Sequence, residues 1–146
     1  MSNRKLETCL YSDNMIYSPK TPVFKTDSGD LLEKHYNISF LTSPAVNAGV
    51  VRDREKKNIA KIDAVMLQRL DKILAIAVVK NYKTLLLGAW GCGVFRNNPT
   101  DVASYFKQQL CENPIYTDYF EKIVFAIYCP GKNKENLEAF SSVFNK

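Results

Sequence analysis

The chain has 146 residues and a formal net charge of +5, with 46% hydrophobic and 24% charged residues. This length and composition are typical of one globular domain. No apolar run approaches the ~18 residues of a membrane span, and the N-terminal residues lack the apolar core of a secretory signal, so we expect a cytoplasmic protein with no membrane partner. Its scattered basic residues mildly favour anionic ligands and predict no specific nucleic-acid binding.

The cysteines give no sign of a metal site. Cys9, Cys92, Cys111 and Cys129 form no CxxC pair, and His35 is the only histidine. We therefore expect reduced thiols, no metal and no cofactor. A cysteine–histidine nucleophile is the weaker alternative for Cys92, which lies between two glycines and is interpreted as a small residue that allows a tight turn.

The first half of the chain contains turns, one strand and one long helix. Residues 1–34 are expected to form a polar N-terminal segment, irregular or hairpin-like, with short β-prone pieces and a strong turn at 26–30. Alternation predicts a strand over 35–41, followed by a loop of small and polar residues over 42–49. The charged stretch 52–61 is expected to be a solvated loop or the start of a helix. Apolar residues at three- and four-residue steps predict a long helix over 59–80.

The second half alternates strands and helices. We predict a strand over 84–87, a helix over 99–110, a strand over 122–128 and a last helix from 133 or 134. This order predicts an α/β fold with parallel strands, in which ligands bind beyond the carboxyl ends of the strands. If the three strands are parallel neighbours, their following loops line one crevice. These loops are 42–49, 88–98 and 128–132.

The connection between 84–87 and the helix at Pro99 is the most informative stretch. It contains three glycines within six residues and reaches the helix through Asn98, a favourable N-cap. A strand, a glycine turn and a helix N-terminus together favour a phosphate or diphosphate site. The spacing matches neither GxGxxG nor a P-loop, so a tight turn beneath a packed helix stays an equal alternative. Trp90 and Phe95 are interpreted either as walls of a nucleoside pocket or as core residues.

The same stretch carries a family resemblance. Leu-Gly-Ala-Trp-Gly-Cys-Gly-Val-Phe-Arg-Asn-Asn-Pro at 87–99 closely resembles the microbial-type poly(ADP-ribose) glycohydrolases, and segments 11–24, 40–49, 124–127 and 136–144 resemble other blocks of that family. The resemblance implies a three-layer α/β/α macrodomain-like fold with a mixed, mostly parallel sheet. It further implies that 1–146 is one such domain, corresponding to the C-terminal part and lacking the N-terminal strands and the catalytic loop.

The resemblance also implies a ligand site. In this family the glycine loop wraps the diphosphate of ADP-ribose through backbone amides, and Phe95 would contact the distal ribose. The residues implied for the diphosphate and ribose are Gly91, Cys92, Gly93, Val94, Phe95 and Arg96. The residues implied for the adenosine side are Ser43, Pro44, Asn47 and Tyr128, with the loop that continues to Pro130.

Two motifs of the family do not occur in these 146 residues. Its catalysis depends on a Gly-Gly-Gly loop and a Gln-Glu-Glu motif, and neither is present. We therefore name no catalytic residue and expect a domain that binds ADP-ribose or an ADP-ribosylated protein but is catalytically incompetent alone. The alternatives are an active hydrolase completed by another chain and a degenerate structural or interaction module. A missing strand would also favour a homo-oligomer or a complex with a complementing N-terminal half.

Overall fold

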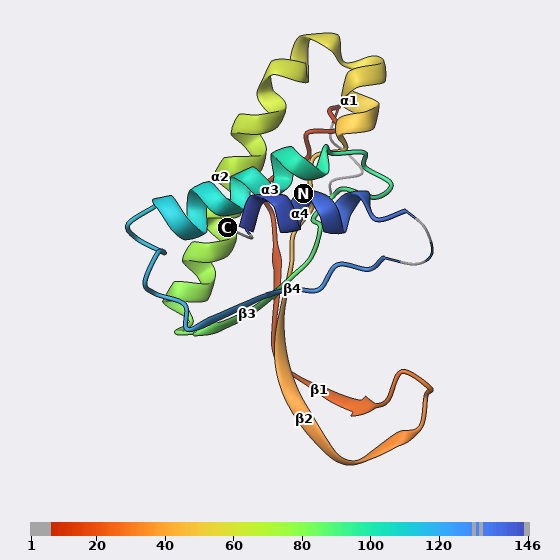
Figure 1. Cartoon of the computed structure of the whole chain (residues 1–146), viewed down its shortest axis with the longest axis vertical. Coiled ribbons are helices and arrows are strands. Elements are labelled where there is room, and N and C mark those ends of the chain that lie inside the picture. The colour runs from red at the N-terminus through yellow and green to blue at the C-terminus, as the bar shows by residue number, and fades with distance from the viewer. Residues whose placement is uncertain (1–6, 130, 132, 145–146) are drawn as a thin grey trace. The chain divides into compact units, whose positions relative to one another are not determined.

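The computed structural model describes residues 7–129, 131 and 133–144, and the chain forms two compact units (Figure 1). The first unit comprises residues 1–12 and 45–146, and the second comprises 13–44. None of the helices in the described part of the chain is long and apolar enough to cross a membrane.

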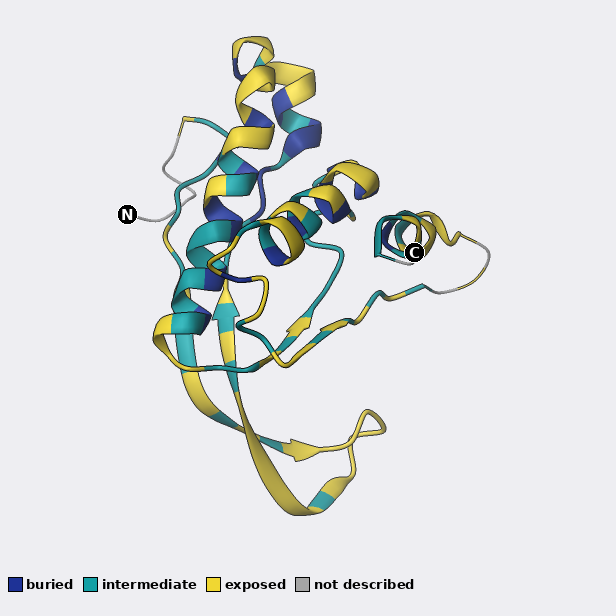
Figure 2. Cartoon of the chain, turned by 60° about the vertical axis from the view of Figure 1, so that its left-hand side comes forward, coloured by how far each residue is buried: buried dark blue, intermediate teal, exposed yellow. Residues whose placement is uncertain are grey.

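The second unit is a β-hairpin. Strand β1 (Ile16–Lys25) pairs antiparallel with β2 (Leu31–Thr42). Most residues of both strands are exposed (Figure 2). The turn predicted at 26–30 is confirmed, because the Gly29 amide donates to the Thr26 carbonyl at 3.0 Å and Gly29 has a φ of +94°. The strand predicted over 35–41 is confirmed within β2. Its expected parallel pairing is wrong, because β2 pairs with β1 and joins neither strand of the first unit.

The first unit contains a parallel strand pair and a group of helices. Its elements are α1 (Ala48–Arg54), the 3-10 helix η2 (Lys56–Lys61), α2 (Ile62–Val79), β3 (Thr84–Leu87), α3 (Pro99–Lys107), the π-helix η3 (Gln108–Glu112), β4 (Lys122–Phe125) and α4 (Glu135–Phe144). The α/β class is confirmed, with one parallel and one antiparallel strand pair in the described residues.

Several elements differ from the sequence predictions; for example, the helix predicted over 99–110 is α-helical only to Lys107 and continues as η3. Helix α1 lies where a loop and a charged stretch are expected, and Asn47 caps it by accepting a hydrogen bond from the Val50 amide at 3.2 Å. The predicted long helix begins as η2 and becomes α-helical at Ile62. Strand β4 ends at Phe125, three residues before its predicted end.

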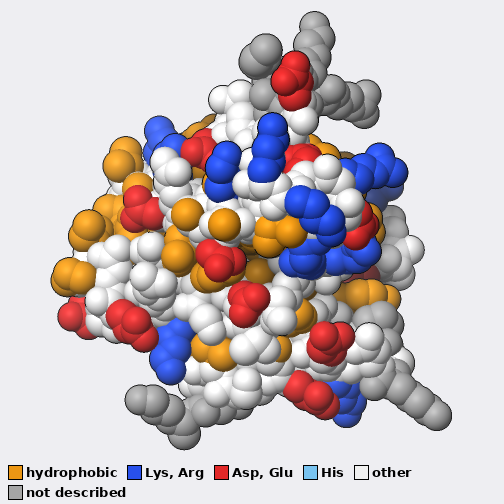
Figure 3. Space-filling view, turned by 90° about the horizontal axis from the view of Figure 1, so that it is seen from above, with side chains coloured by type: hydrophobic (Ala, Val, Ile, Leu, Met, Phe, Trp, Pro, Cys, Tyr) orange, Lys and Arg blue, Asp and Glu red, His pale blue; other side chains and the backbone are white. Residues whose placement is uncertain are grey.

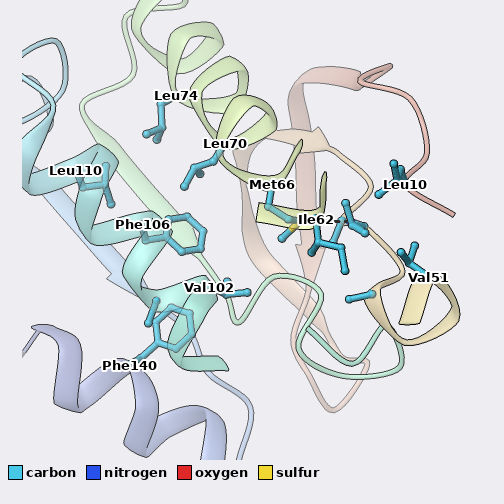
Figure 4. Close-up of a cluster of buried hydrophobic side chains, with 14 of the residues drawn as sticks. Leu10, Val51, Ile62, Met66, Leu70, Leu74, Val102, Phe106, Leu110 and Phe140 are labelled. Atoms are coloured by element: carbon cyan, nitrogen blue, oxygen red, sulfur yellow. Dashed lines mark hydrogen bonds between the residues drawn. The ribbon is translucent and has the colours of Figure 1, made fainter. Parts of the chain in front are cut away.

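The core of the first unit lies between its helices and one face of the β3–β4 pair. Leu85 and Leu87 of β3 pack against this core, as do Ile123 and Phe125 of β4. The ring centroid of Phe125 lies 5.2 Å from that of Phe106 in α3. Figure 4 shows buried side chains from the N-terminal segment and from α1, α2, α3, η3 and α4; those labelled are Leu10, Val51, Ile62, Met66, Leu70, Leu74, Val102, Phe106, Leu110 and Phe140.

Among the described residues, one buried side chain is charged. Arg69 of α2 is fully buried, and its guanidinium donates to the carbonyl of Leu10 at 3.0 Å. A buried cation needs such acceptors because its desolvation is costly. Arg69 therefore fixes the segment that precedes the hairpin against the middle of α2.

Candidate functional site

The glycine loop, residues 88–98, joins β3 to α3 and approaches the segment before α1 very closely. Gly91 has a φ of +76°, and a Cβ there would lie 2.5 Å from the Ala45 Cβ and 2.6 Å from the Asn97 Nδ2. L-residues disfavour this φ, and real Cβ atoms do not approach other atoms this closely. Only glycine therefore fits at position 91.

Asn97 holds the loop in this position. Its side chain is 5% exposed, and its Nδ2 donates to the carbonyls of Val46 at 2.8 Å and Gly91 at 3.0 Å. Its backbone amide also donates to the Gly91 carbonyl, at 3.1 Å. One buried carboxamide thus joins both ends of the loop and ties them to the segment before α1.

The tip of the loop presents backbone donors that the described residues leave unused. The Cys92 amide donates to the Ala89 carbonyl at 3.1 Å, and the Arg96 amide donates to the Gly93 carbonyl at 2.9 Å. Between them, the amides of Gly93, Val94 and Phe95 donate to no acceptor among the described residues. Gly93 and Val94 are exposed, and Val94 is 92% exposed. Successive free amides on an exposed turn are suited to the oxygens of an anion.

The N-terminus of α3 has its own cap. Asn98 Oδ1 accepts hydrogen bonds from the amides of Thr100 at 2.8 Å and Asp101 at 3.3 Å. The N-cap predicted at Asn98 is confirmed, and so is Pro99 as the first helical residue. Because this side chain occupies both amides, the donors left for an anion lie in the loop tip rather than in the first turn of α3.

Helix α1 holds the C-terminal end of the loop. The Gly49 amide donates to the Phe95 carbonyl at 2.9 Å, and the Arg52 guanidinium donates to the Arg96 carbonyl. The Arg96 guanidinium pairs with Asp53 and lies against Gly49, where a Cβ would overlap it. Its hydrogen bond to Asp53 holds the pKa of that carboxyl below its usual range. The sequence gives no direct signal for this arrangement, because it depends on a helix that the pattern does not predict.

The two aromatic residues of the loop have different surroundings. Trp90 is half-buried and packs against the hydrophobic core. Phe95 is also half-buried and touches the core, and its ring centroid lies 5.8 Å from that of Tyr11. Phe95 supplies the last of the three free amides, so its ring is placed beside the exposed loop tip.

Cys92 is not an activated nucleophile. It is half-buried, and burial together with the nearby Glu135 carboxylate raises the pKa of its thiol to about 11. The thiolate is the reactive form of cysteine, and a thiol with this pKa stays protonated at neutral pH. The geometry thus favours the interpretation of Cys92 as a small residue in a tight loop.

The residues predicted for the adenosine side lie in different parts of the chain. Asn47 caps α1, and its amide donates to the Cys9 carbonyl at 3.0 Å. Tyr128 follows β4 and is 86% exposed. Ser43 and Pro44 belong to the second unit, after β2, and Pro130 lies outside the described residues. These assignments stay predictions.

Charge on one face of the molecule is mixed. On the face shown in Figure 3, Lys and Arg side chains are interspersed with Asp and Glu. Alternating signs of this kind are typical of a solvated surface and do not form the basic stripe of a nucleic-acid interface. On this face the side-chain charges therefore form no continuous basic patch.

Comparison with solved structures tests the family resemblance. No family model matches the sequence, and no curated protein matches it. Poly(ADP-ribose) glycohydrolase from Deinococcus radiodurans in complex with ADP-ribose matches 97% of this chain and 56% of its own, with a TM-score of 0.90 and 35% identity. The Thermomonospora curvata glycohydrolase matches 97% of this chain and 51% of its own, with a TM-score of 0.89 and 38% identity.

This chain has the fold of part of a microbial poly(ADP-ribose) glycohydrolase. The resemblance predicted from the glycine run is thereby confirmed, and so is the macrodomain-like α/β class. The chain spans about half the length of the glycohydrolases that it matches.

Proposed function

We propose that this chain binds ADP-ribose and that its glycine loop takes the diphosphate. The observation that carries the proposal is the set of three successive amides, at Gly93, Val94 and Phe95, that have no acceptor among the described residues. Hydrogen bonds from backbone amides to charged oxygens are shorter and stronger than neutral ones. The ADP-ribose complex of the Deinococcus radiodurans glycohydrolase supports the choice of ligand.

Within this site the residues have distinct roles. The amides of Gly93, Val94 and Phe95 donate to the diphosphate, and the Phe95 ring packs against the distal ribose. Gly91 and Cys92 supply the tight turn that presents these amides. Arg96 closes the loop through its bonds to α1. In this proposal the diphosphate is bound by backbone amides, while Gly91, Cys92 and Arg96 keep the loop in the shape that presents them.

The adenosine half is proposed to meet Ser43, Pro44, Asn47 and Tyr128. Of these, Tyr128 offers the clearest chemistry, because an exposed ring can stack on a purine. The natural ligand is then free ADP-ribose or an ADP-ribosylated protein, met in the cytoplasm.

We propose binding rather than hydrolysis as the activity of these 146 residues. Cleavage of a glycosidic bond needs a carboxylic acid at the leaving oxygen and normally uses a second carboxylate. The Gln-Glu-Glu motif of the family does not occur in this sequence. One acidic group next to the loop, Asp53, is already paired with Arg96.

Calorimetric titration with ADP-ribose tests this proposal, and AMP serves as the control because it has one phosphate and no distal ribose. We expect micromolar binding of ADP-ribose and much weaker binding of AMP. Phe95→Ala is expected to weaken ADP-ribose binding, whereas Ile115→Ala, at an exposed position outside the loop, is expected to leave it unchanged. Equal affinities for ADP-ribose and AMP, or no binding at millimolar ADP-ribose, would overturn it.

A further inference from the structure

The parallel β3–β4 pair has one covered face and one bare face. Along both strands half-buried and exposed residues alternate, and the two strands are in register (Figure 2). The side that packs against the helices contains Leu85, Leu87, Ile123 and Phe125. The opposite side, here called the bare sheet face, contains Thr84, Leu86, Lys122 and Val124.

The centre of the bare sheet face is apolar. Leu86 is 71% exposed and its neighbour in register, Val124, is 38% exposed. Lys122 lies only at the beginning of β4, so no charge interrupts the middle of either strand. Sheets that face water normally place polar or charged residues at such positions, which also discourages unwanted pairing. The bare sheet face therefore has the composition of a surface that is covered.

The edges of the same pair are also open. Among the described residues β3 pairs only with β4, so the outer edge of each strand has no neighbouring strand. Parallel strands are normally covered on both faces and belong to larger sheets. An apolar face and two open edges on one strand pair indicate a sheet that continues into further polypeptide.

The comparisons indicate which polypeptide this is. Solved glycohydrolases align with nearly all of this chain at TM-scores of 0.88 to 0.92, yet the alignment covers only 51% to 57% of their length. In each of them a comparably large part of the chain remains beyond the aligned region. We propose that the bare sheet face and the adjoining edges bind the complementary part of a poly(ADP-ribose) glycohydrolase fold, which adds a strand and covers Leu86 and Val124.

Co-expression tests this docking surface. The whole chain is produced with a tagged complementary part of the Deinococcus radiodurans glycohydrolase, which is the part that this chain does not match. We expect a 1:1 complex by size exclusion with light scattering. Leu86→Lys and Val124→Lys are expected to abolish co-purification, whereas Ile115→Lys, a matched change at a 64% exposed position outside the sheet, retains it.

A second experiment is needed if the complementary part is insoluble when it is produced as a separate chain. The same part is fused to this chain in one polypeptide, and hydrogen exchange is compared with that of the chain alone. Slower exchange over 84–87 and 122–125 in the fusion is expected. Unchanged exchange in a folded fusion, or a homodimer of the chain alone that Leu86→Lys dissociates, would overturn the proposal. Both experiments are done without ADP-ribose, so their failure is distinct from failure of ligand binding.

Discussion

At the scale of single residues, two glycines of the same loop have opposite surroundings. Gly91 has a positive φ and no space for a side chain, whereas a Cβ on Gly93 would meet nothing within 4 Å. A side chain at position 93 would therefore disturb no packing and would project from the exposed loop tip. Folding depends on the first glycine, and access to the free amides depends on the second.

We predict that Gly93→Val lowers ADP-ribose affinity at least about tenfold, a loss of about 1.4 kcal/mol, while the melting temperature stays that of the parent chain. Gly91→Ala is predicted to destabilise the fold by about 2 kcal/mol or more, because it combines a strained φ with steric overlap. Calorimetric titration and thermal unfolding of both variants check this. A Gly93→Val chain that binds ADP-ribose normally would contradict the assignment of the loop tip.

The adjacent asparagines form a second matched pair. Asn97 donates to two carbonyls that position the loop, whereas Asn98 accepts from two amides that begin α3. Asn97→Asp keeps the shape but removes the donor, so we predict both a lower melting temperature and weaker ADP-ribose binding. Asn98→Ala removes only a cap, which costs about 1 kcal/mol of stability and leaves affinity unchanged. Equal effects of the two changes on affinity would exclude a positioning role for Asn97.

At the scale of elements, one carboxylate joins the N-terminal segment to the end of α1. Glu55 accepts hydrogen bonds from the Thr8 hydroxyl, from the Cys9 amide at 2.7 Å and from the Asn58 side chain at 2.8 Å. These donors, led by the Thr8 hydroxyl, lower the pKa of Glu55 to about 2. The charged form is thus the one that the folded chain favours.

A pH dependence follows from this shift. The pKa of Glu55 in the folded chain lies below its ordinary value of 4.5. The ionised Glu55 carboxylate therefore stabilises the fold above about pH 4.5, and this stabilisation is lost as the pH falls toward 2. We predict that the parent chain melts at a higher temperature than Glu55→Gln at pH 6 and that the two curves converge near pH 2. Thermal unfolding across this range checks it. A constant difference between the two chains at all pH values would show that the charge of Glu55 is irrelevant.

Local patterns predict some elements well and others poorly. The apolar run at 84–87 and the turn at 26–30 are confirmed because their signals depend on adjacent residues. Helix α1 is missed because its cap, Asn47, lies among small residues that look like a loop. The partner of β2 is mispredicted because alternation reveals a strand but not its neighbour. Arg69 and Asn97 are buried by tertiary contacts that no spacing rule signals.

At the scale of the whole molecule, the glycine run at 87–99 is the segment of the sequence that best indicates the fold. Its residues identify the correct family of folds, and solved glycohydrolases confirm this over 97% of the chain. The glycine run alone does not show which backbone amides of the loop are already hydrogen-bonded. Only the folded loop separates the donors already used, at Cys92 and Arg96, from those that the described residues leave free. The ligand proposal rests on this distinction.

The most direct test of that distinction is the amide NMR spectrum of the ¹⁵N-labelled chain during titration with ADP-ribose. We expect large, saturable shifts for the amides of Gly93, Val94 and Phe95, with smaller shifts for Cys92 and Arg96, whose amides already donate within the loop. AMP at the same concentration should leave the three loop-tip amides nearly unmoved. Shifts confined to residues outside the loop, or none at saturating ADP-ribose, would show that the loop tip does not bind the diphosphate.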